Sequence, residues 1–448
     1  MPGRARRGGG VKPVRGAREA DVVVFGAGPA GIAAAVTAAR DGRSVCLIEL
    51  QNVVGGVMSS CPGMMLGSGY PCGTSIGGFF EELVARLCDQ DPPAAERRPC
   101  SLENFGDEVV YDHEYALSAL YDLLADSGVE VLLNHLPIRV AVADDQITGV
   151  DVATAQGVER FHTGIYIDCT GDGDVATKAG VPSQLGDDRG LTMGATLTFF
   201  MENVDWDKAF PPGADPYFTE HAARGVASGR LPRTQPQIYL LKGFRRGSVY
   251  FNTVTVTGVE GTDVRSVAFG TRLARRQVMQ LARFCQDEIP GFEDSYLSHI
   301  GPTIGVRETR RLEGLYTLTA ADVAKATKFE DGVVACDGPL DEVFRDESSS
   351  YYSHEAALPK GEYYTIPFRA LVPRKVRNLL FAGRARSVDL KAYATGRGMP
   401  QCMGMGQSVG IGAGMAISDG CAVQDIDRRL LVAKLVRLGV NGICGGRL

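Results

Sequence analysis

Three glycines and one glutamate near the start of the chain have the residue types and the spacing to bind a nucleotide. Gly26, Gly28 and Gly31 fit the pattern G-x-G-x-x-G, and Glu49 follows about twenty residues later. Glycines at a helix start let phosphate oxygens reach free backbone N–H groups, where the helix dipole also favours negative charge. The carboxylate can accept a hydrogen bond from a ribose 2′-hydroxyl, whereas it would repel a 2′-phosphate. The predicted dinucleotide contacts are Gly26, Gly28, Pro29, Ala30, Gly31 and Glu49.

The residues around this motif predict the elements that would position it. Residues 21–25 are apolar and mostly β-branched, which is typical of a buried parallel strand. An alanine-rich stretch follows the glycines and stops at Asp41-Gly42, as a helix would, and residues 43–48 supply a second strand. Strand, helix, second strand and acid are in register for a dinucleotide-binding βαβ unit. The alternative is a glycine-rich turn that serves only packing.

Further glycine-bearing turns follow Glu49 or predicted strands. Gly55-Gly56 comes soon after the acid and permits another close backbone approach. Residues 166–169 indicate a strand that runs into the segment 170–174, where Asp172 can bond a hydroxyl. A second apolar strand runs into Ala382-Gly383-Arg384. The uncharged stretch 399–418 is too rich in glycine to favour lipid, so it indicates buried helix and loop.

The order of these segments resembles that of a known family. The segments 170–174 (TGDGD), 305–310 (GVRETR), 366–373 (IPFRALVP) and 378–384 (NLLFAGR) are similar to segments of FAD-dependent oxidoreductases. The chain is identified as a member of that family, a group of two-dinucleotide-binding-domain flavoproteins, over residues 20–425. The resemblance implies FAD as the cofactor. It also implies an α/β fold in which a Rossmann-like, glutathione-reductase-like FAD-binding domain carries an inserted α+β substrate domain built on an antiparallel sheet.

The resemblance also assigns contacts to FAD beyond the first motif. The segment after Glu49 would reach the ribose and the flavin, main-chain atoms after the next helix would meet the adenine, and the later turns would close on the phosphates. A final helix, beginning near Gly404, would direct its N–H groups at the flavin. The residues implied are Leu50, Gly55, Gly56, Val57, Met58, Pro137, Ile138, Thr170, Gly171, Asp172, Gly383, Arg384, Gly406, Gln407 and Val409.

Length and composition constrain the organisation of the chain. At 448 residues it can hold two domains, and we expect a disordered tail over 1–19. The predicted division is an FAD-binding domain from 20–189 and 356–425, a substrate domain from 190–355, and a C-terminal helix and tail from 426–448. The tail lacks the apolar core of an export signal, and the eleven cysteines then favour a reducing cytoplasm.

The charge balance and the cysteine spacing limit the partners. A net charge of −6 without a basic stripe in the folded part argues against nucleic acid as a partner and against an RNA-modifying flavoprotein. We expect a small-molecule substrate, no membrane, no metal site and an electron acceptor that is oxygen or a carrier. Many flavoproteins of this class form dimers, although nothing in the sequence shows one.

Two regions that should face substrate depart from the family pattern. The loop 59–73 carries Cys61 and Cys72, which are either buried structural thiols or groups that react with, or attach to, the flavin. The stretch 389–393 (DLKAY) differs from the Ser/His-rich form that the family leads us to expect. Arg307, Arg310 and Arg311 could anchor a substrate carboxylate or the flavin, or could equally pair with acids such as Glu308.

The chemistry implied is hydride transfer from a substrate C–H, in an alcohol, an amine or a saturated C–C bond, to flavin N5. No second strand–glycine–helix unit is present for a tightly held nicotinamide cofactor. The alternatives are the reverse reaction, reduction of an activated C=C bond, or an FAD-binding protein without turnover. Candidate catalytic residues are His354, Tyr393 and Arg397, each of which could instead be structural.

Overall fold

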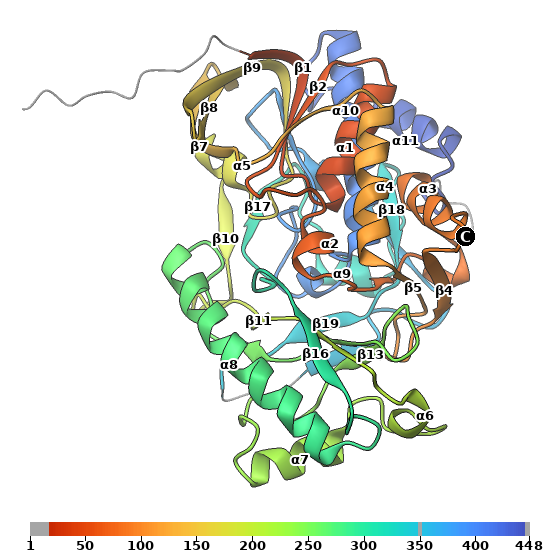
Figure 1. The fold of residues 1–448 in the computed structure, drawn as a ribbon. Helices are drawn as coiled ribbons and strands as arrows, with labels where there is room; N and C mark the ends of the chain where they lie inside the picture. Colours follow the sequence, from red (N-terminus) through yellow and green to blue (C-terminus); the bar gives the residue numbers. More distant parts are fainter. Residues whose placement is uncertain (1–17, 348–351, 444–448) are drawn as a thin grey trace, which may run out of the picture.

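A seven-stranded sheet lies in the upper part of the molecule as Figure 1 shows it. The structure, a computed structural model, describes residues 18–347 and 352–443. Residues 1–17, most of the predicted tail, lie outside it, as do 348–351 and 444–448. The parallel part has the order β6-β2-β1-β9-β22, and β8 and β7 extend it in antiparallel fashion. The bounds are β1 (Arg18–Phe25), β2 (Val45–Ile48), β6 (Glu130–Leu132), β7 (Leu136–Ala143), β8 (Gln146–Thr154), β9 (Gly157–Asp168) and β22 (Leu379–Phe381).

Two helices pack face to face against the parallel strands. The first, α1 (Pro29–Arg40), follows the glycine turn as predicted, and α10 (Met399–Asp419) lies beside it in Figure 1. A Cβ at Gly406 would clash with the carbonyl of Ala30, and one at Gly410 would meet the carbonyl of Ala34. The glycines of α10 therefore let the two backbones approach closely.

The glycine-rich stretch near the C-terminus is one continuous helix rather than helix and loop. It begins at Met399, after Gly398, so the expected helix start near Gly404 was wrong. Pro400 in the first turn is the local signal for the start, because its missing N–H costs nothing there. None of the helices in the described ranges is long and apolar enough to cross a membrane.

A second, antiparallel sheet lies in the lower part of Figure 1, with the order β13-β14-β12-β16. Its strands are β12 (Phe199–Glu202), β13 (Leu240–Lys242), β14 (Val249–Phe251) and β16 (Tyr296–Ile300). Buried side chains of this sheet and of α8 (Val264–Glu288) form a separate apolar core, in which the rings of Phe199 and Phe251 stack at 4.3 Å.

The first sheet also has an apolar core, around α1 and α10, and the members of the two cores help to locate the domain boundary that was predicted at residue 355. The second core draws its members from residues 195–304, whereas buried residues between 318 and 344 belong to the core around α1 and α10. The division into FAD-binding and substrate domains stays a prediction, and the cores favour a boundary closer to residue 306 than to 355.

The remaining helices and short strands lie outside these two sheets. The helices are α2 (Val57–Ser60), α3 (Gly78–Cys88), α4 (His113–Asp126), α5 (Asp174–Lys178), α6 (Trp206–Ala209), α7 (Thr219–Ala227), α9 (Ala320–Ala324) and α11 (Arg428–Arg437). The paired short strands are β3 (Leu66–Gly67) and β4 (Ala95–Pro99) with β5 (Asp107–Tyr111), β10 (Ser183–Leu185) with β17 (Arg310–Leu312), β11 (Ala195–Thr196) with β15 (Thr255–Val256), β18 (Gly332–Cys336) with β21 (Tyr364–Pro367), and β19 (Leu340–Val343) with β20 (Tyr352–Glu355).

Candidate functional site

Three neighbouring parallel strands end side by side, and a glycine turn follows each of them. Phe25 of β1 and Phe381 of β22 are both in register with Asp168 of β9. The amide of Cys169 donates to Phe25 at 2.7 Å, and the amide of Ala382 donates to Asp168 at 3.0 Å. The turns at 26–28, 169–171 and 382–384 therefore leave the sheet at one edge, where ligands of open parallel sheets bind.

The glycines of the first motif are needed for different reasons. Gly26 has φ +92°, and a Cβ there would clash with the carbonyl of Cys169; a Cβ at Gly31 would clash with the carbonyl of Gly26. The protein's own packing thus demands glycine at both positions. Gly28 differs, because a Cβ there would meet only the Cα of Gly56, at an ordinary 3.8 Å. Its space is not filled by the protein, which agrees with the pyrophosphate contact that the motif predicts here, and that contact stays a prediction.

Glu49 directly follows β2 and lies against the first glycine turn. It is 8% exposed, and its carboxylate accepts hydrogen bonds from the amides of Ala27 at 2.6 Å and Gln51 at 2.8 Å. The amide of Gly55 donates to the carbonyl of Ala27 at 2.7 Å, which holds the second glycine pair against the first turn. The start of β7 is also close, since the amide of His135 donates to the carbonyl of Glu49 at 2.9 Å.

These contacts place most of the remaining predicted nucleotide residues near the turn. Pro137 and Ile138 follow His135 in β7, and Val57 and Met58 begin α2 directly after the glycine pair. Leu50, which directly follows Glu49, is 57% exposed. Their contacts with the cofactor stay predictions.

The later turns are joined by an ion pair. Asp172 accepts hydrogen bonds from the Arg384 guanidinium and, at 2.8 Å, from the hydroxyl of Thr309. Arg384 also donates to the carbonyl of Gly171 at 3.1 Å. The predicted Thr170–Asp172 and Gly383–Arg384 segments are thus brought together, with the carboxylate of Asp172 occupied by an arginine. Its role toward a hydroxyl stays a prediction.

The three predicted residues of α10 pack against protein. Gly406 lies against the backbone of Ala30, Gln407 accepts a hydrogen bond from the amide of Phe79 at 3.1 Å, and Val409 is fully buried. All three lie beyond the first turn of the helix, so the N–H groups at its free end belong to residues near Met399 instead. Contacts of these three residues with FAD stay predictions.

Comparisons with known proteins agree with this geometry. The model of the family described as FAD dependent oxidoreductase matches residues 21–435. The chain belongs to this family. As an FAD-dependent oxidoreductase it is an enzyme whose cofactor is FAD. A search of curated proteins found no match.

Solved structures of similar fold include several flavoenzymes. One is a geranylgeranyl bacteriochlorophyll reductase-like protein from Thermoplasma acidophilum, with a TM-score of 0.52, 15% identity, and coverage of 94% of this chain and 83% of that one. Another is p-nitrophenol 4-monooxygenase from Pseudomonas putida, with a TM-score of 0.51, 12% identity, and coverage of 94% and 88%. A third, a flavin-dependent brominase, has a TM-score of 0.51, 11% identity, and coverage of 94% and 83%. At these identities the likeness concerns the fold.

The residues at the sheet edge fit FAD. The unfilled space at Gly28 suits a pyrophosphate, and Glu49 offers a carboxylate at the distance along the motif that a ribose requires. When bound, FAD would supply the hydride-accepting chemistry, and the protein would supply position and electrostatics.

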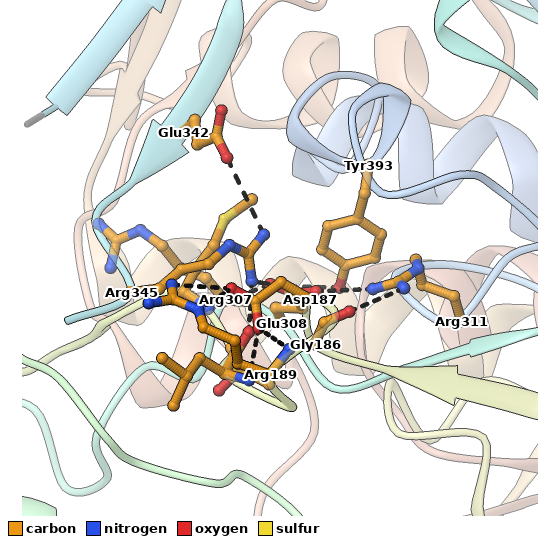
Figure 2. Close-up of polar contacts among 12 residues, drawn as sticks. Gly186, Asp187, Arg189, Arg307, Glu308, Arg311, Glu342, Arg345 and Tyr393 are labelled. Carbon is orange, nitrogen blue, oxygen red and sulfur yellow. Dashed lines mark hydrogen bonds and ion pairs between the residues drawn. The ribbon is translucent and has the colours of Figure 1, made fainter.

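The arginines predicted as substrate or flavin anchors in 305–311 have protein partners. Figure 2 shows Glu308, which is fully buried and pairs with Arg311 at 2.7 Å and with Arg345. Glu308 also accepts from the amide of Met193 at 3.0 Å. Arg307 donates to Thr196 and Asn252, and Arg310 pairs with Asp174 at 3.0 Å. The structural alternative therefore accounts for all three.

The predicted catalytic residues lie near one another. Tyr393 is fully buried, and its hydroxyl donates to the carbonyl of Arg307 at 3.1 Å. Arg397 pairs with Asp341, whose backbone stands opposite His354 in the β19–β20 pair. The side chain of His354 lies outside the described part of the structure. The catalytic roles of the three residues stay predictions.

The cysteines of the 59–73 loop differ in surroundings. Cys61 is buried, and burial raises the pKa of its thiol. Cys72 is exposed and has φ +51°. Partial desolvation of its thiol, together with the negative charge of Asp337, raises the pKa of that thiol. Both therefore favour the protonated thiol, which is the less nucleophilic form.

Two polar residues in this region were not singled out from the sequence. Asp337 follows β18, accepts a hydrogen bond from the amide of Cys72 at 2.8 Å, and has a pKa that desolvation raises to about 6. Arg386 is fully buried two residues after Arg384. Neither belongs to a sequence motif, so only the packing reveals them.

Proposed function

We propose that this FAD-dependent oxidoreductase is a dehydrogenase or oxidase that takes hydride from a C–H of a small molecule, an alcohol or an amine. The observation that carries the proposal is the half-buried carboxylate of Asp337. Its pKa of about 6, raised by desolvation, suits a general base at neutral pH, because such a base is ionised and still accepts a proton readily.

Asp337 lies where the loop 59–73 approaches the start of α10. Its carboxylate accepts from the amide of Cys72, and the carbonyl of the next residue, Gly338, accepts from the hydroxyl of Thr395 at 2.8 Å. The side-chain amide of Gln401, in the first turn of α10, donates to the carbonyl of Ser68 at 2.6 Å. The loop, Asp337 and the helix start are therefore tied together, and the family resemblance implies that this loop runs near the flavin.

The proposed division of labour is simple. Bound FAD would supply the acceptor for the hydride of the substrate C–H, which carries two electrons and one proton, and Asp337 would take the remaining proton from the substrate hydroxyl or amine. Oxygen or an electron carrier would then remove the two electrons. The protein's tasks are to orient the C–H and to receive that one proton.

Anaerobic stopped-flow mixing of the oxidised holoenzyme with a panel of alcohols and amines tests this proposal. A reactive substrate should bleach the flavin band, and the reduction rate should fall as pH drops below about 6, when Asp337 is protonated. Asp337→Asn should bind FAD but reduce slowly at every pH. Asp419→Asn, an exposed change at the end of α10, is the control. An unchanged pH profile in Asp337→Asn would exclude Asp337 as the base.

Reduction of an activated C=C bond is the second candidate, and a different observation favours it. The hydroxyl of Tyr111 is buried without a hydrogen-bond partner among the described residues, and burial raises its pKa, so it remains a proton donor at physiological pH. Delivery of hydride to one carbon of an enone requires such a donor for the other. Rapid reoxidation of the dithionite-reduced enzyme by an enone, and its loss in Tyr111→Phe, would favour this reaction.

A further inference from the structure

Arg386 is a buried cation that has no carboxylate partner among the residues that the structure describes. Its side chain is fully buried, and its Nη2 donates to the carbonyl of Thr395. Its Nε and Nη1 have no hydrogen-bond partner within the described ranges. The neighbouring arginines differ, because Arg384 pairs with Asp172 and Arg397 pairs with Asp341. A buried guanidinium that lacks a counter-ion is costly, so its retention calls for a ligand.

Four titratable side chains that lie close to Arg386 are neutral. Its guanidinium carbon lies 5.6 Å from the centre of the Tyr393 ring. Burial raises the pKa of the Cys336 thiol to about 12 and that of the Cys402 thiol to about 11, even though Arg386 opposes both shifts. Burial likewise raises the pKa of Tyr364 and of Tyr393. At neutral pH these four groups are protonated, so none of them supplies the missing negative charge.

Other unsatisfied polar atoms lie in the same stretch of chain. The Nε of Arg397 is buried without a partner in the described part of the chain, and so is the Oε1 of Gln401, a residue only 1% exposed. The first turn of α10, which contains Gln401, adds free N–H groups and the positive end of the helix dipole. Three of these unpartnered atoms, Nε and Nη1 of Arg386 and Nε of Arg397, are donors and match an oxyanion, whereas the Oε1 of Gln401 is an acceptor and does not help to bind one.

We propose that Arg386, with the start of α10, binds a planar oxyanion. Two sources share this chemistry, namely the carboxylate of a substrate and the negatively charged N1–C2=O edge that reduced flavin presents. The second source rests on the proposed position of FAD at this sheet edge. If the oxyanion is a substrate carboxylate, the substrate carries both this carboxylate and the alcohol or amine that is oxidised. The substrate class is then a hydroxy acid or an amino acid, with the oxidised carbon at a fixed distance from Arg386.

The test compares the wild-type holoenzyme with Arg386→Met, which keeps the length of the side chain and removes the charge. One arm titrates the oxidised holoenzyme with benzoate and follows the flavin absorbance. The other arm measures the midpoint potential of the bound flavin against a reference dye. Arg369→Met is the matched control, because Arg369 is paired with Asp331 at 2.9 Å and lies outside this cluster.

If the ligand is a substrate carboxylate, benzoate should bind wild type, and Arg386→Met should weaken its binding at least about tenfold with the potential unchanged. If the ligand is reduced flavin, Arg386→Met should disfavour reduction by about tenfold, about 30 mV for a two-electron couple, with benzoate binding unchanged. Arg369→Met should leave both quantities as in wild type. Either positive result supports the proposal and names the source.

The proposal is overturned if Arg386→Met holoenzyme matches wild type in both arms. It is also overturned if Arg386→Met unfolds while Arg386→Gln, which likewise removes the charge, folds and matches wild type in both arms, because the charge would then bind no ligand. Equal FAD content in wild type and variant separates this outcome from a failure of the cofactor site. Failure of the proposed dehydrogenase reaction would appear instead as absence of substrate bleaching in wild type, which neither arm requires.

Discussion

Buried arginines on two sides of Tyr393 differ in how their charge is balanced. On one side, Glu308 pairs with Arg311 and Arg345, and the hydroxyl of Tyr393 donates to the carbonyl of the adjacent Arg307 (Figure 2). On the other side, Arg386 approaches the Tyr393 ring without a carboxylate partner in the described part of the molecule. Paired buried charges hold the structure together, whereas an unpaired one is a place for a ligand.

The glycines at the sheet edge differ in a similar way, because the protein fills the space beside some of them and leaves it free beside another. Gly26 and Gly31 have no room for a Cβ because the protein's own backbone fills the space. Gly28 has room for one within the protein alone. A residue that the fold does not explain, whether an unfilled glycine or an unpaired arginine, points to what the molecule binds.

We expect the largest effect on stability from removing Glu308, the carboxylate that balances two buried arginines. Glu308→Ala leaves Arg311 and Arg345 buried without their carboxylate, so we expect a loss of about 3–5 kcal/mol in the free energy of unfolding. Urea unfolding followed by tryptophan or far-UV signals measures it. Glu313→Ala is the control, because Glu313 is 49% exposed and 3.8 Å from Arg374, and it should change stability by less than about 1 kcal/mol. Equal losses would contradict the comparison.

The next prediction distinguishes a glycine that binds the cofactor from a glycine that the packing of the protein requires. Gly28→Val should fold yet weaken FAD binding by about a hundredfold or more, because its side chain fills the space left for the pyrophosphate. Gly31→Val should instead fail to fold, since its side chain meets the carbonyl of Gly26. Fluorescence titration with FAD and thermal unfolding of the apoproteins distinguish the two. Wild-type FAD affinity in Gly28→Val would remove the reason given for that glycine.

Glu49 should give a smaller effect at the same edge. Glu49→Gln keeps an acceptor for the amide of Ala27 but removes the charge offered to a ribose hydroxyl. We expect FAD affinity to fall roughly tenfold, which is the scale of one hydrogen bond to a charged group. Isothermal titration with FAD and with a 2′-deoxyribose analogue checks the assignment. If the variant loses as much affinity for the deoxy analogue as for FAD, Glu49 does not contact that hydroxyl.

The smallest effect concerns pH and Asp337. Desolvation raises its pKa in the folded state to about 6 from 3.8, so the folded protein holds this proton more tightly than the unfolded chain. Stability from this group is therefore present at low pH and is lost as pH rises through about 6. Asp337→Asn should raise the melting temperature at pH 8 and raise it less at pH 5. An equal shift at both values would show that Asp337 is not buried as described.

The sequence predicted the sheet edge well, because the signals there are local. The strand before Gly26, the helix after it and Glu49 lie within one stretch, and each glycine is explained by its own turn. The start of α10 was misplaced because Gly398 is one of many glycines, and the proline two residues later was the better signal.

The unpaired residues could not be predicted in the same way. Whether Arg386 has a partner depends on side chains from β18, β21 and α10, which are brought together only by the fold. The raised pKa of Asp337 arises from burial that its neighbours in sequence do not reveal. Length and composition also gave no sign that residues 318–344 would join the first core.

Hydrogen exchange with and without FAD tests the central claim that the separate glycine turns surround one cofactor. Adding FAD to the apoprotein should slow exchange together at 26–31, 55–58, 169–173 and 382–386, because all four segments meet at one edge of the sheet. The account predicts this protection to saturate at one FAD per chain. Protection at the first motif alone, with the other three segments unchanged, would contradict it.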